Sequence, residues 1–134
     1  TLIPGTEWTH YKGHAGFWAQ NRLSVTLFHA SLEETRDLFK EAGENGAFRV
    51  INHPFCPLVP WEWDFSLPFD GLEVWNGVMS ERNEKAAIWW HQQLCSGRKL
   101  PVTGGSDYHR PGLLGSLAMP CQCLYALPDP GRIC

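Results

Sequence analysis

Five side chains of types that bind divalent metals lie in separate parts of this 134-residue sequence. They are Glu7, His14, His53, Asp107 and His109. Imidazole and carboxylate ligands together suit zinc, manganese or iron(II). A carboxylate can also bridge two such ions about 3.5–4 Å apart, an arrangement suited to hydrolytic chemistry. The residue types therefore predict a metal-binding site, provided that the fold brings them together.

The pair formed by Asp107 and His109 is the most specific of these signals. It follows Gly104 and Gly105, and glycines allow a tight turn and a close approach of the backbone. If the backbone remains extended, Asp107 and His109 share a face, because side chains two residues apart point the same way. A lone histidine or glutamate is more often a structural or solvated residue. The prediction therefore depends on the convergence of all five residues.

The segments that would position these residues alternate between strand-like and helix-like patterns, which predicts an α/β fold. Strands are expected at residues 2–4, 48–51, 72–76, 100–103 and 121–127. Ligands of parallel α/β sheets gather at the C-terminal ends of the strands, and several polar candidates follow these segments directly. We therefore expect one edge of the sheet to carry the site.

Two helices are expected between the strands. Ser31 is followed three residues later by Glu34, which forms a capping box, and Gly43 is suited to end that helix. Ser80 is expected to begin a second helix that ends near Cys95. Spacing of i, i+3, i+4 and i+7 predicts an apolar stripe by which this helix packs on the core. The stripe consists of Ala87, Trp90, His91 and Leu94.

The stretch 54–69 carries four prolines and much aromatic content, which predicts a long ordered loop of functional importance. Trp61 and Trp63 lie within it, and buried packing is the common role of such side chains. A different interpretation is a Trp-rich carbohydrate-binding module in which both rings stack on sugars. The block around Asp107 and His109 argues against that module, because a stacking platform does not need it.

Composition and charge narrow the class of protein. Hydrophobic residues make up 43% of the chain and charged residues 19%, as in a globular domain. The net charge of −3 implies no basic surface for nucleic acid. No apolar run approaches the roughly 18 residues that span a membrane. Five cysteines without a CxxC pair favour reduced thiols, and hence a reducing compartment such as the cytoplasm.

Five blocks of this sequence occur in the order found in PHP-domain phosphoesterases. They are residues 4–9, 13–14, 51–54, 72–76 and 104–109. The chain resembles that superfamily over nearly its whole length, and it is most similar to the CehA/McbA-type metallohydrolases. The resemblance implies a distorted (β/α)7 barrel with two or three zinc, manganese or iron ions at the C-terminal ends of its strands. It also implies metal-dependent hydrolysis of a small-molecule phosphoester, a carbamate or a related ester.

Matched residue by residue, the resemblance implies that Glu7 is the carboxylate that bridges two metals. His14 and His53 would be ligands of one metal, and Asp107 a ligand of its neighbour. His109 would be a ligand at the third position or at the edge of the cluster. Asp107 and His109 are also the catalytic candidates, and His109 or another pocket group would protonate the leaving oxygen.

Asn76 and Glu73 match the strand-end motif beside the substrate, so they would line or support the pocket without binding metal. The family begins with a His-x-His pair, and only six residues precede Glu7 here. We therefore expect residues 1–134 to be the C-terminal portion of a single PHP-like domain, whose barrel lacks its first strands. The remaining alternative is a remnant of the same fold that binds a metal or ligand without catalysis.

Overall fold

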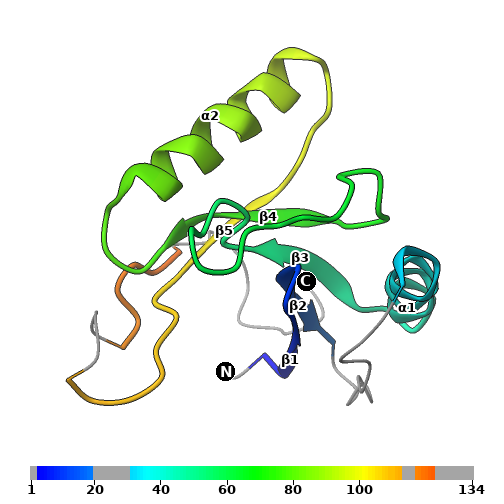
Figure 1. Cartoon of the computed structure of the whole chain (residues 1–134), viewed down its shortest axis with the longest axis horizontal. Helices are drawn as coiled ribbons and strands as arrows, with labels where there is room; N and C mark the ends of the chain where they lie inside the picture. The colour runs from blue at the N-terminus through cyan, green and yellow to red at the C-terminus, as the bar shows by residue number, and fades with distance from the viewer. Residues whose placement is uncertain (1–2, 20–30, 113–116, 123–134) are drawn as a thin grey trace.

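The computed structural model describes residues 3–19, 31–112 and 117–122 (Figure 1). Along the chain, the elements are β1 (Gly5–His10), β2 (Gly13–Trp18), α1 (Leu32–Glu44), β3 (Phe48–Asn52), β4 (Gly71–Asn76), α2 (Glu81–Cys95) and β5 (Val102–Gly105). The strands form one sheet in the order β1-β2-β3-β4-β5, and Figure 1 shows α1 next to β3 and α2 alongside β4. The expected α/β character is therefore present in the described part of the chain.

The sheet is mixed and open, so the expected (β/α)7 barrel is wrong. The pairs β1–β2 and β2–β3 are antiparallel, whereas β3–β4 and β4–β5 are parallel. Only Tyr11 and Lys12 separate β1 from β2, and a connection this short permits only antiparallel pairing. The strand β2 was not predicted, because its two glycines, Gly13 and Gly16, weaken the β pattern. The strand expected at residues 2–4 begins instead at Gly5.

The first helix forms where its capping box predicts. The Ser31 hydroxyl accepts a hydrogen bond from Glu34 N at 3.2 Å, and Glu34 Oε2 accepts one from Ser31 N at 2.7 Å. The helix buries Thr35, Phe39 and Ala42. The Phe39 ring lies edge-on to aromatic rings of β1 and β2, which anchors α1 on one face of the sheet.

The second helix has the predicted ends, but of the predicted stripe only Trp90 packs against the core, and Ala87, His91 and Leu94 are exposed. Its N-cap is Ser80 and it ends at Cys95, while its buried residues are Asn83 and Ala86. His91 is exposed, as is Leu94 with 38% of its surface accessible. Trp89 and Trp90 pack against the core, and polar contacts that hydrophobic periodicity does not predict also hold the helix. Asn83, for example, bonds the backbone of Asn76 at the end of β4.

The long loop over residues 54–69 completes the core, as the aromatic content suggested. Trp61 and Trp63 are buried with 7% of their surface exposed, and they join a cluster that includes Phe17, Ile51 and Leu72. Of the strand expected at 121–127, residues 123–127 lie outside the described ranges, and Cys121 and Gln122 are not in a strand. Within the described residues, neither helix has the length and apolar character needed to cross a membrane.

Candidate metal centre

Three of the five predicted ligands converge at one point. Glu7, His14 and His53 each offer one ligand atom, and these atoms all lie within 4.8 Å of one another. Glu7 Oε1 is 3.6 Å from His14 Nδ1 and 3.8 Å from His53 Nε2. The two imidazole rings meet edge-on, with centroids 4.9 Å apart.

Strand register places two of these side chains on the same face of the sheet. Glu7 is opposite Gly16 and His14 is opposite Thr9, so Glu7 and His14 are diagonal neighbours across the β1–β2 pair. Both point away from the face that carries the buried ring of Trp8, since adjacent residues of a strand alternate. The pairing of the hairpin therefore brings the carboxylate and the first imidazole together.

Asn52 completes this face and was missed by the sequence analysis. It is opposite His14 in the β2–β3 pair, and its amide donates a hydrogen bond to Glu7 Oε1 at 2.8 Å. A Cβ at Gly16 would lie only 3.3 Å from Asn52 Oδ1, so the glycine leaves room for the asparagine side chain. The available signal was the position of Asn52, directly before His53 at a strand end.

The backbone of His53 is turned to bring its ring to the same face. Because Asn52 faces Glu7, an extended His53 would point to the opposite face. Its φ of +29° instead redirects the chain, although a residue before proline is normally extended. Two bonds hold this unusual conformation: His53 N donates to Glu73 Oε2 at 2.8 Å, and His53 O accepts from Cys56 N at 2.9 Å. Such local strain is typical of functional sites.

The centre concentrates negative charge that suits a cation. Hydrogen bonds from His14, His53 and Asn52 hold the pKa of Glu7 far below its usual range. Burial opposes the charged form of His53, but the bond to Glu7 and the charges of Glu73 and Asp107 together raise its pKa above the usual value. An arrangement that stabilises a proton on His53 also attracts a divalent ion, which would compete with that proton.

Glu73 and Asn76 lie behind the ligands. Both are buried, with 8% and 3% of their surfaces exposed. Glu73 Oε2 accepts hydrogen bonds from His53 N and from Asn76 Nδ2, at 2.8 and 3.2 Å. Burial raises the pKa of Glu73 to about 7, against the opposing effect of these bonds. The pair thus supports the turn at His53 and does not join the group of ligand atoms.

Asp107 and His109 are near the centre but are not in this group. Asp107 has a φ of +50°, so the extended backbone expected for the pair is not found. Its charge acts on both His53 and Glu73. The His109 side chain is 63% exposed and its Nδ1 lies 2.7 Å from the Asp107 carbonyl oxygen. The two residues therefore contact each other, and of the two it is the charge of Asp107 that acts on His53.

The donor set fits a divalent ion. Two imidazoles and one carboxylate are the ligands of many catalytic zinc sites, which keep a further position open. Tetrahedral bonds of about 2.0–2.1 Å place ligand atoms roughly 3.4 Å apart. The separations of 3.6 and 3.8 Å from Glu7 Oε1 are close to that value, while the group as a whole spans up to 4.8 Å. Glu7 and His14 are partly exposed, so the centre is open to solvent on one side.

Comparisons with known proteins identified no similar protein. No family model, curated protein or solved structure matches the chain. The functional argument therefore depends on the geometry of the centre.

Proposed function

We propose that this protein is a metal-dependent hydrolase, with a divalent ion held by Glu7, His14 and His53. The observation that carries the proposal is the convergence of these three ligand atoms within 4.8 Å. A mixed set of nitrogen and oxygen donors suits zinc, manganese or iron(II). The partial exposure of Glu7 and His14 would give a substrate access to the ion.

When bound, the ion supplies a water of lowered pKa and polarises the bond that is to be cleaved. Glu7 contributes a carboxylate that remains charged at neutral pH, since its neighbours hold its pKa low. Asn52 fixes the orientation of that carboxylate, and Glu73 fixes the backbone of His53. Such supporting hydrogen bonds commonly set both ligand geometry and metal affinity.

We further propose a PHP-type activity on phosphoesters or related esters of small molecules. The order of the sequence blocks around Glu7, His14, His53 and Asp107 supports it. Asp107 is close enough for its charge to act on His53, so it is the candidate ligand of a second ion. His109, largely exposed and in contact with Asp107, is the candidate donor of a proton to the leaving oxygen.

A catalytically incomplete remnant is the second candidate. It is favoured by the position of Asp107 and His109 outside the group of three ligand atoms. In this case the chain would bind an ion at Glu7, His14 and His53 without hydrolysing an ester. The carbohydrate-binding module has less support, because Trp61 and Trp63 are buried and offer no surface platform.

Metal titration of the purified chain tests the proposal. We expect about one zinc or manganese ion per chain, measured by calorimetry and elemental analysis. His14→Ala should lose this binding, while His91→Ala removes an exposed histidine on α2 and should not. Binding that is absent, or equal in His14→Ala and the parent, would refute the metal centre.

Hydrolysis separates the enzyme from the remnant. With metal bound, we expect the parent to cleave a chromogenic aryl phosphate or aryl ester, and we expect a chelator or His14→Ala to abolish cleavage. Metal binding without cleavage of any such ester would favour the remnant. Cleavage that survives the chelator would exclude the proposed mechanism.

A further inference from the structure

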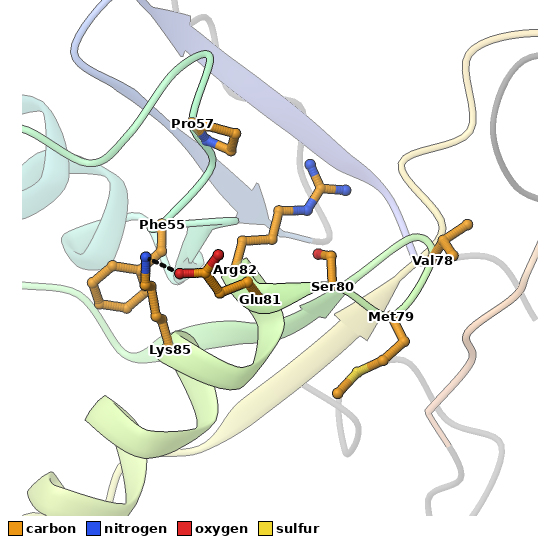
Figure 2. Close-up of a pocket in the computed structure, with 8 residues that line it drawn as sticks. All are labelled: Phe55, Pro57, Val78, Met79, Ser80, Glu81, Arg82 and Lys85. Atoms are coloured by element: carbon orange, nitrogen blue, oxygen red, sulfur yellow. Dashed lines mark ion pairs between the residues drawn. The ribbon is translucent and has the colours of Figure 1, made fainter.

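A pocket of about 420 Å³ lies between the segment that follows His53 and the start of α2. Its walls come from the segment that follows His53, the segment that follows β4 and the first turns of α2. The lining residues are Phe55, Pro57, Val78, Met79, Ser80, Glu81, Arg82 and Lys85 (Figure 2). The volume lies within the range typical of small-molecule sites, about 300–1,000 Å³.

The pocket and the proposed centre are linked through the chain segment that follows His53. Phe55 lies two residues beyond His53, so their Cα atoms are within about 7 Å of each other. Arg82 contacts Cys56 Sγ at 3.8 Å and donates to the Asn76 carbonyl at 3.3 Å. Cys56 N in turn bonds the carbonyl of His53. These contacts therefore connect the wall of the pocket to the backbone of His53.

One part of the lining is apolar and uncovered. Val78 and Met79 have 59% and 58% of their surfaces exposed, and Phe55 lies at the other end of the pocket in Figure 2. Methionine adapts to irregular shapes and packs well on aromatic rings. The apolar walls thus fit a flat aromatic or aliphatic body.

The remaining part of the lining carries one uncompensated positive charge. Lys85 Nζ is 2.7 Å from Glu81 Oε1, so these two charges offset each other. Arg82 has five N–H donors, of which one bonds the Asn76 carbonyl and one meets a sulfur, a weak acceptor. Its buried Nε has no hydrogen-bond partner among the described residues. Beyond these two contacts, each terminal nitrogen of the guanidinium, drawn in Figure 2, has one further N–H that can donate to an anion.

We propose that this pocket binds small organic anions with an apolar body, the anionic group on Arg82 and the body against Val78 and Met79. As a subsite, it would select substrates of that class for the metal centre, and this role rests on the proposed hydrolase function. The binding itself does not depend on the hydrolase function, because no residue that lines the pocket is one of the three proposed metal ligands.

Phenylphosphonate is a suitable probe, since it has an aromatic body, carries negative charge and has no ester to cleave. Binding to the chelator-treated protein is measured by calorimetry, beside inorganic phosphate and benzyl alcohol. We expect phenylphosphonate to bind at least about tenfold more tightly than either fragment, because only it uses both parts of the pocket. Equal affinity for inorganic phosphate, or no binding of phenylphosphonate, would overturn the proposal.

Two variants of pocket residues and one control variant test whether phenylphosphonate binds in this pocket. Arg82→Gln should weaken phenylphosphonate binding about tenfold or more, as loss of a charge-assisted hydrogen bond does. Met79→Glu changes an exposed residue, so it should leave folding intact and repel the anion. Lys40→Gln removes an exposed charge on α1 and should have no effect. Unchanged binding in both pocket variants would place the ligand elsewhere.

The two proposals fail separately. His14→Ala should lose zinc and keep phenylphosphonate, whereas Arg82→Gln should lose phenylphosphonate and keep zinc. Zinc binding without phenylphosphonate binding would refute only the proposal that the pocket binds organic anions. Phenylphosphonate binding without zinc binding would overturn the metal centre alone.

Discussion

The buried carboxyl of Glu73 makes the metal-free protein lose stability as pH rises. Burial raises its pKa to about 7 in the folded chain, from an ordinary value of 4.5. The folded state therefore keeps its proton more tightly than the unfolded state does. The contribution of Glu73 to the free energy of unfolding is fully present below pH 4.5 and decreases between about pH 4.5 and 7. Above that range it no longer changes with pH.

The size of the effect follows from the shift. One pKa unit corresponds to about 1.4 kcal/mol, so a shift from 4.5 to about 7 corresponds to roughly 3–4 kcal/mol. Most of this loss falls between pH 5 and pH 8. Glu73→Gln removes the titration, and the amide oxygen can still accept the hydrogen bonds from His53 N and Asn76 Nδ2. The variant should therefore lose less stability over this range than the parent.

Urea unfolding in the presence of a chelator measures the difference, with the fluorescence of the seven tryptophans as the signal. The free energy of unfolding at pH 5 minus that at pH 8 should be larger for the parent than for Glu73→Gln, by roughly 2–3 kcal/mol. Glu84→Gln alters an exposed glutamate of α2 and should behave like the parent. Parallel pH profiles for parent and Glu73→Gln would refute the reasoning.

Three further predictions concern the centre and its frame. Asn52→Ala removes the donor to Glu7, so zinc affinity should fall about 10- to 100-fold by calorimetry; an unchanged affinity would exclude a supporting role for Asn52. Zinc affinity should also weaken as pH falls from 8 to 6, since the raised pKa of His53 makes protons stronger competitors. A pH-independent affinity over that range would contradict coordination by this imidazole. Gly13→Ala should destabilise the chain by about 1–3 kcal/mol in urea unfolding, because φ is +128° and the new Cβ would lie 2.6 Å from Trp61 Cε3; stability equal to the parent would contradict this geometry.

Local signals in the sequence predicted the helices well. The capping box of Ser31 and Glu34 forms as expected, and Ser80 begins α2. These features depend on residues within one or two turns of each other, so adjacent sequence contains the information. The residue types of Glu7, His14 and His53 likewise indicated metal chemistry before their positions were known.

The sheet was predicted less well because pairing depends on distant residues. The hairpin of β1 and β2 joins β3 in antiparallel register, and this excludes the uniformly parallel barrel implied by the resemblance. The face of α2 that packs was also missed. Asn83 is buried through its bonds to the backbone near the end of β4, which hydrophobic periodicity does not register.

The sequence by itself determined the chemistry available to this protein: two imidazoles and a carboxylate in separate segments, with Asp107 and His109 as further candidates. Only the tertiary structure decided which of them meet. Strand register sets Glu7 beside His14, and a positive φ at His53 turns its ring toward them. Asp107 also has a positive φ, which ends the extended backbone expected for Asp107 and His109. Side-chain direction in a strand follows register and backbone angle, and both are fixed by contacts between residues far apart in the chain.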